Sequence, residues 1–229
     1  MIGGAVGMIN RAIRRAAANA GGGDWWLSGG VLAAGCEAAY QPIGAASYAA
    51  SKVNLNNPGT NDATEGIAPA WATGVGWTFD GNDDYLSTGV SPVAGGSMIC
   101  RFSDGSVDAT QMLAGMMTGP NNRFYLMSRH TLDKHYYGYG DVAAEVAGRL
   151  VAGVMALAGA TGYLDGAFEV ATGGTLNALD VREIAIGAQN NEDQGYANLW
   201  RGVIEALAIY NITLTAPQVD AITTAMQAL

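Results

Sequence analysis

Residues 200–211 read WRGVIEALAIYN, and this stretch says more about the fold than any other. Its Val, Ile and Tyr content is typical of a β-strand. The apolar residues Ile204, Leu207 and Ile209 do not alternate perfectly. Such a pattern predicts a closing strand that is buried on both faces near its end.

The rest of the chain from Trp25 onward repeats this kind of segment. Runs of four to eight residues rich in Val, Ile, Tyr, Phe and Trp alternate with Gly, Asn, Asp and Pro. Asp165-Gly166 predicts a hairpin, because Gly adopts the positive φ that such turns require. Many short strands with frequent turns predict an all-β, two-sheet antiparallel β-sandwich. The candidate strands are 75–80, 84–89, 97–103, 122–128, 135–139, 150–157, 161–165, 167–171, 182–187 and 200–210.

Two further regions complete this expectation. Residues 33–74 are rich in Ala, Asn and Pro, and we expect a long irregular connection across the edge of the sandwich. A short C-terminal helix follows Thr215, which is placed to cap it, with Pro217 in the first turn. Its buried stripe is predicted to be Val219, Ile222, Met226 and Leu229.

Four segments resemble one protein superfamily when they are taken in order. They are 76–86 (GWTFDGNDDYL), 162–166 (GYLDG), 184–187 (IAIG) and 200–211. Together they resemble the laminin-G-like, concanavalin-type lectin/glucanase superfamily, of the kind found in phage and environmental structural proteins. The resemblance covers residues 75–229 and implies a concanavalin-like jelly roll. We therefore expect a jelly-roll domain at 24–229, preceded by a separate arm at 1–23.

The first 23 residues differ from the rest in charge and periodicity. They hold three arginines and no acid, so they carry +3, whereas the remainder of this −9 chain carries −12. A short basic amphipathic helix ending at a Gly hinge, residues 21–23, is predicted. In this assembly arm one face carries Ile2, Val6, Ile9 and Ile13, whereas Arg11, Arg14 and Arg15 point elsewhere. Such an arm suits an acidic protein partner, including another copy of this chain; a solvated, frayed terminus is the alternative.

The composition of the chain disfavours several classes of structure, ligand and partner. With 49% apolar and only 14% charged residues, the chain has ample material for a core. The acidic balance argues against nucleic acid, and an arm without Trp or Phe disfavours a membrane surface. Cys36 and Cys100 are 64 positions apart, which favours two buried free thiols over zinc or a disulfide. No signal peptide or transmembrane segment is visible, and we expect location in a virion or an extracellular assembly.

Two polar loops are candidate sites. Asp80, Asn82 and Asp84 could supply oxygen ligands to calcium, the one cofactor considered; a solvated β-turn is the favoured alternative. Near the last strands, a second set could hold a sugar by ring stacking and hydrogen bonding, although a polar exposed loop ahead of core aromatics is favoured. This carbohydrate-binding set is Asn190, Asn191, Tyr196 and Trp200.

The sequence contains no complete catalytic pattern of the kinds known for glycosidases or serine hydrolases. The Glu-x-Asp-x-x-Glu pattern of laminarinase-type relatives is absent, and Asp180 and Glu183 flank a dipeptide that sets them on opposite strand faces. No Gly-x-Ser-x-Gly elbow accompanies His130 and His135. We therefore predict a non-enzymatic protein. The leading role is a virion or other assembly surface subunit, such as a capsid-decorating or tail-associated protein; a carbohydrate-binding adhesive module is the alternative, and a glycan-degrading enzyme is disfavoured.

Overall fold

Strand β17 (Arg201–Tyr210) is the centre of the fold, and it has the burial on both faces that its sequence predicted. In the computed structural model, which describes residues 23–105, 110–130, 133–177, 181–192 and 195–229, every residue of β17 after Arg201 is buried. β6 (Ser97–Ser103) pairs along one edge of β17. The other edge pairs first with β4 (Gly76–Asp80) and then with β1 (Cys36–Tyr40).

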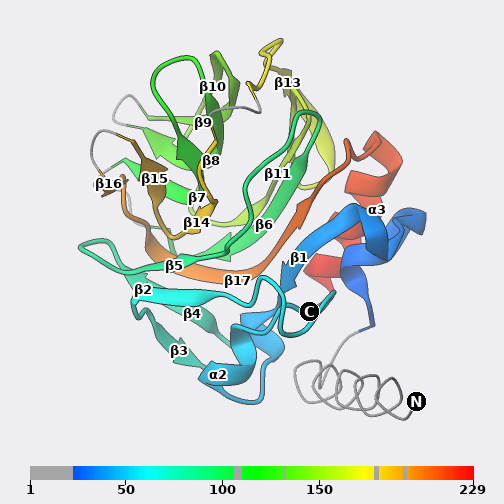
Figure 1. Cartoon of the computed structure of the whole chain (residues 1–229), viewed down its shortest axis with the longest axis vertical. Coiled ribbons are helices and arrows are strands. Elements are labelled where there is room, and N and C mark those ends of the chain that lie inside the picture. The colour runs from blue at the N-terminus through cyan, green and yellow to red at the C-terminus, as the bar shows by residue number, and fades with distance from the viewer. Residues whose placement is uncertain (1–22, 106–109, 131–132, 178–180, 193–194) are drawn as a thin grey trace, which may run out of the picture.

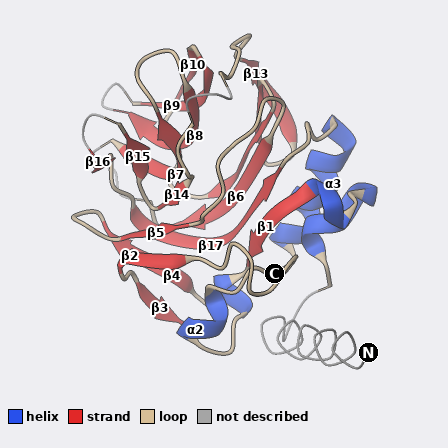
Figure 2. Ribbon diagram, in the orientation of Figure 1, coloured by secondary structure: helices blue, strands red, loops and turns tan. Residues whose placement is uncertain are grey.

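These strands belong to the first of two sheets, called sheet A here, which face each other (Figures 1 and 2). Sheet A has the order β13-β12-β11-β6-β17-β4-β3, with β1 also on β17. Its pairings are antiparallel. Its remaining strands are β3 (Ala70–Ala72), β11 (Gly153–Ala158), β12 (Thr161–Leu164) and β13 (Ala167–Ala171).

The second sheet, sheet B, has the order β10-β9-β8-β7-β14-β5-β2, with β15 and β16 beside β7. It is antiparallel except where β15 pairs parallel to β7. Its strands are β2 (Thr64–Ile67), β5 (Tyr85–Ser87), β7 (Gln111–Met117), β8 (Arg123–His130), β9 (Lys134–Gly140), β10 (Val142–Ala147), β14 (Ala185–Ile186), β15 (Gln189–Asn191) and β16 (Gly195–Ala197). The described residues therefore form the predicted all-β sandwich.

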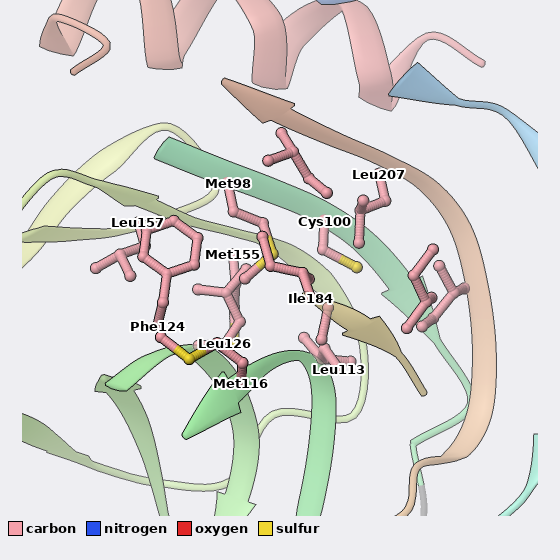
Figure 3. Packing of buried hydrophobic residues seen from close by; sticks show 14 of the residues in the cluster. Met98, Cys100, Leu113, Met116, Phe124, Leu126, Met155, Leu157, Ile184 and Leu207 are labelled. Atoms are coloured by element: carbon pink, nitrogen blue, oxygen red, sulfur yellow. The ribbon is translucent and has the colours of Figure 1, made fainter. Parts of the chain in front are cut away.

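The main core lies between the two sheets. Figure 3 shows Met98, Cys100 and Leu207 of sheet A packed toward Phe124 and Leu126 of sheet B. Alternate residues of the central strands, such as Met98 and Cys100 of β6 and Phe124 and Leu126 of β8, point into this layer, which is the period-two pattern of a two-sheet sandwich. The hairpin at Asp165-Gly166 is confirmed, because both residues have positive φ, 48° and 83°.

A second apolar layer covers the outer face of sheet A. The helix α3 (Ala216–Gln227) packs against the 3₁₀ helix η1 (Trp25–Gly30), and both lie on sheet A (Figure 1). The capping box of Thr215 and Gln218 begins α3, and Val219, Ile222 and Met226 on this helix are buried, as predicted. Leu229, the fourth residue of the predicted stripe, lies beyond the end of α3 and is only partly buried. Because of this cover, β17 is buried on both of its faces.

The interpretation of residues 33–74 as irregular was wrong. This region contains β1, β2 and β3, together with η2 (Ala33–Gly35), η3 (Pro42–Gly44) and the one-turn helix α2 (Tyr48–Ser51). β1 reads CEAAY, a sequence of modest strand preference, and it is a strand because it pairs with β17. Tertiary pairing therefore overrode local preference here.

The predicted arm lies outside the described residues except for Gly23, so its helix and the boundary at residue 23 stay predictions. Within the described part of the chain, no helix has the length and apolar character needed to cross a membrane.

Candidate functional site

The outer face of sheet B carries a hollow of about 390 Å³. Its described lining comes from strands of this one sheet and from Asn198, just after β16. Apolar and aromatic side chains form the floor, and polar ones stand around it. The lining residues are Met117, Arg123, Tyr125, Met127, His130, Tyr136, Ala143, Gln189, Asn191 and Asn198.

The floor follows from the alternation along β8. Phe124 and Leu126 point into the core, so Arg123, Tyr125 and Met127 point outward. On the neighbouring strand β9, Tyr136 lies directly opposite Met127 and shares its face. Met112 of β7 packs with these residues beneath the hollow.

Tyr125 lies flat on the sheet because the residue opposite it is Gly138. A Cβ atom at Gly138 would lie 2.6–2.7 Å from three atoms of the Tyr125 ring, so the ring covers the glycine face-on. Tyr125 is 5% exposed, and this burial raises the pKa of its hydroxyl to about 12, although the Arg123 charge acts in the opposite direction. The hydroxyl therefore stays protonated at neutral pH and can donate a hydrogen bond.

Amide side chains form one polar wall of the hollow. Gln189 and Asn191 are two apart on β15, so they share a face, and Asn198 lies beside them. The Asn198 Nδ2 donates to Gln189 Oε1 at 2.8 Å, and Gln189 Nε2 lies 3.4 Å from the Met117 sulfur. These contacts fix the orientation of the Gln189 and Asn198 amides. Primary amides offer both donors and acceptors to a ligand.

The opposite wall carries charge. Arg123 Nη1 donates to the backbone carbonyl of Asp141 at 2.7 Å. The Tyr136 hydroxyl donates to Glu145 Oε2 at 3.0 Å, and Lys134 pairs with the same carboxylate. The hydrogen bonds from Lys134 and Tyr136 lower the pKa of Glu145, so its carboxylate remains ionised and bound to these two side chains.

The structure separates the four residues predicted to bind sugar. Asn191 lies in the hollow. Asn190 and Tyr196 are directly opposite each other in register and share the other face of their strands. There Asn190 Nδ2 donates to the Glu183 carbonyl at 3.1 Å, and the Tyr196 ring stacks on Tyr85 with centroids 3.6 Å apart.

Trp200 is 0% exposed and packs edge-on against Phe102 in the core, with ring centroids 5.6 Å apart. In this position its ring is not accessible for stacking on a sugar. The residues that the sequence analysis missed, Tyr125, Met127 and Tyr136, carried a usable signal. Their strands were predicted, and alternate residues of RFYLM would have identified the outward face.

The predicted calcium turn is compact. The carboxylates of Asp80, Asp83 and Asp84 lie within 4.8 Å of one another. Asp80 accepts from the backbone and side chain of Asn82, which lowers its pKa, and Asp84 accepts from the Asp80 backbone N–H at 3.0 Å. Burial, followed by the Asp80 and Asp83 charges, raises the pKa of Asp84. These bonds are those of a self-contained turn, and calcium binding there stays a prediction.

Comparisons with known proteins identify the fold but no family. No family model and no curated protein matches the chain. Among solved structures, Trypanosoma rangeli sialidase in complex with sialic acid aligns over 99% of this chain and 40% of its own length, at TM-score 0.61 and 14% identity. A mutant of that sialidase displaying trans-sialidase activity aligns over 86% and 34%, at TM-score 0.61 and 16% identity. The chain thus spans well under half of these sialidases.

A smaller match is the CBM40 of Ruminococcus gnavus IT-sialidase bound to alpha2,3 sialyllactose. It covers 58% of this chain and 84% of the module, at 16% identity and a TM-score of 0.45. The sandwich is therefore shared with sialidase structures, whereas none of these structures is described as laminin-G-like or concanavalin-like.

The comparisons overturn the prediction that the chain is not an enzyme. Two solved structures that share its fold are described as a sialidase and as a sialidase mutant displaying trans-sialidase activity, and these are enzymes. The prediction was wrong because the two-carboxylate arrangement is not common to all enzymes that hydrolyse glycosidic bonds. Sialidases use a tyrosine nucleophile and fall outside that rule. The missing glutamate pair was therefore not evidence against catalysis.

Proposed function

We propose that this chain is a carbohydrate-binding β-sandwich module that holds a glycan in the hollow on the outer face of sheet B. The observation that carries the proposal is the composition of that hollow: an apolar and aromatic floor of Tyr125, Met127 and Tyr136 beside a wall of oriented amides. Ligand sites in proteins typically combine a concave apolar surface with a few fixed polar groups.

Sugars match both halves of this surface. The C–H face of a pyranose packs on aromatic and thioether side chains, and its hydroxyls exchange hydrogen bonds with amides. The floor residues come from neighbouring strands, and the amides of Gln189 and Asn198 are held by contacts to each other and to Met117. Such preorganisation reduces the entropy lost on binding. The sialic acid bound by T. rangeli sialidase is consistent with a glycan ligand here.

The test compares two tyrosines. A glycan array with the whole chain should identify ligands, and calorimetry should then measure their affinity for Tyr136→Ala and Tyr196→Ala. Tyr136→Ala removes floor area from the hollow, and we expect affinity to fall about tenfold, as for the loss of one aromatic contact. Tyr196 lies on the other face, so its variant is the matched control.

Thermal unfolding of both variants must show that they are folded. A glycan site at the predicted loop instead would give the reverse order, with the Tyr196 variant losing affinity. If no glycan binds the whole chain, the proposed function is wrong.

The assembly role has less support. It rests on an arm that lies almost wholly outside the described residues, and the solved structures named above that align at a TM-score of 0.61 are sialidase structures. Docking onto protein subunits through that arm, and a virion or extracellular location, stay predictions. A glycan-binding surface subunit would combine the two roles.

A further inference from the structure

The charge of the hollow is opposite to that of the chain. The chain carries a formal charge of −9, with 20 acidic residues. None of the described lining residues is an aspartate or glutamate, while Arg123 and His130 both line the hollow. A low-dielectric concave wall strengthens the field of a cation placed in it. The hollow therefore favours a ligand that is more acidic than a neutral sugar.

Arg123 is available for such a ligand. Other basic side chains pair with carboxylates: Lys52 with Glu65, Arg101 with Glu205, Lys134 with Glu145, and Arg149 with Asp133. Within the described chain, Arg123 forms no ion pair, and its one hydrogen bond is from Nη1 to the carbonyl of Asp141. A guanidinium has five N–H donors in a planar fork. Most of that fork is left for a ligand.

The carboxylate of Glu145, which lies next to the hollow, does not cancel the attraction of Arg123 for an anionic ligand. Glu145 touches the lining through the Tyr136 hydroxyl, but Lys134 holds the same carboxylate, which offsets its charge. Arg123 begins β8 and His130 ends it, with Tyr125 and Met127 between them. At about 3.3 Å per residue, Arg123 and His130 lie about 20 Å apart along the strand, so Arg123 stands at one end of the lining that β8 contributes.

We propose that the glycan held in this hollow is acidic, and that Arg123 binds its carboxylate while Tyr125, Met127 and Tyr136 pack against the sugar rings. The proposal rests on the proposed function. Arg123 acts as the specificity-determining residue, because a bidentate guanidinium–carboxylate pair is strong and geometrically selective. The amide wall binds hydroxyls and does not discriminate by charge.

The experiment uses matched ligands that differ in one group. The whole chain is titrated with an oligosaccharide ending in glucuronic acid and with the same oligosaccharide ending in glucose, so that a carboxylate replaces a hydroxymethyl group. A sulfated partner and one ending in a nine-carbon keto acid form two further arms, which separate a general anion site from a carboxylate site. We expect the glucuronate or keto-acid ligand to bind at least about tenfold more tightly than the neutral one, the usual effect of a hydrogen bond to a charged group.

Arg123→Gln should bring the ratio of the two dissociation constants close to one and remove its dependence on salt. Arg201→Gln is the matched control, because it removes the same charge from an exposed residue of sheet A. If the chain binds neutral and acidic partners equally, or if the ratio survives Arg123→Gln, this inference is wrong and the proposed function stands. Tighter binding of the sulfated partner than of either carboxylate would also overturn it. If no partner binds, the proposed function itself fails.

Discussion

The two outer faces of the sandwich are built alike and used differently. Each presents apolar side chains away from the main core. On sheet A, Val154, Ala156, Ala206 and Ala208 lie under α3 and η1 and are buried with them. On sheet B, a smaller set around Tyr125 and Met127 lines the hollow. A sheet face becomes a structural layer when the chain supplies a helix to cover it.

This difference indicates where binding can occur without loss of stability. Burying apolar area stabilises the fold by about 25 cal/mol per Å². The cover on sheet A contributes in this way, and a ligand could reach that face only by displacing it. The floor of sheet B keeps part of its apolar surface for a partner. We expect variants of the covered face to reduce stability, and variants of the hollow to affect binding as well.

The largest expected effect is on the reactivity of the two cysteine thiols. One lies under the helices that cover sheet A, and the other lies in the core between the sheets. Cys36 lies in the layer under η1, Cys100 lies between the sheets, and both are free and buried. Burial raises the pKa of both thiols, so the reactive thiolate is scarce at neutral pH. Labelling with an aromatic disulfide reagent should be about 10³-fold slower or more in the native state than in denaturant.

Single variants Cys36→Ala and Cys100→Ala assign the two rates. If the cover is a permanent layer, both rates stay slow in the native protein. Rapid labelling of Cys36 alone would show that η1 and α3 open, and would remove the contrast between the two faces.

The second-largest expected effect is a loss of stability when the packing of η1 on sheet A is weakened. Trp26 is 0% exposed, its indole donates to Asn56 Oδ1 at 3.3 Å, and its carbonyl accepts from the Tyr210 hydroxyl at 2.9 Å. Trp26→Ala should reduce the free energy of unfolding by about 3–5 kcal/mol. Urea denaturation followed by circular dichroism measures it. Leu32→Ala, at a side chain that is 76% exposed, is the control and should change stability by less than about 0.5 kcal/mol.

Strands whose residues prefer β-structure were predicted correctly from the sequence. The predictions at 97–103 and 167–171 coincide with β6 and β13. β7 (QMLAGMM) was missed because Met, Ala and Gly carry little strand preference, and its strand state depends on pairing with β8. Local pattern therefore predicted the class of fold and much of sheet A.

The candidate site was harder to predict, for a physical reason. Asn191 was identified from its polar loop, whereas Tyr125 and Met127 resemble ordinary residues of a half-buried strand. Whether their face is open or covered depends on where α3 packs, and α3 is about 90 residues further along the chain. Long-range packing of this kind is not encoded in the local pattern.

Gly138→Ala should disturb the open face without touching the covered one. The new methyl group would lie about 2.6 Å from the Tyr125 ring, which must lift into the hollow. We expect a stability loss of about 1–3 kcal/mol, typical of overpacking, together with loss of glycan binding in calorimetry. Gly23→Ala is the control, since nothing lies within 4 Å of its added carbon. Unchanged affinity in a folded Gly138→Ala variant would mean that the flat ring is not the binding floor.

The smallest effect compares two tyrosine hydroxyls, one on each face. The buried Tyr210 hydroxyl donates to the Trp26 carbonyl at 2.9 Å, and the Tyr136 hydroxyl donates to the exposed Glu145 at 3.0 Å. Tyr210→Phe leaves a buried acceptor without its partner and should cost about 1–3 kcal/mol. Tyr136→Phe should cost less than about 0.5 kcal/mol, because water replaces the lost donor. Thermal unfolding of the two variants measures the difference. Equal losses would mean that the hollow is as dry and as rigid as the covered face, and a ligand would then have no solvated surface to displace.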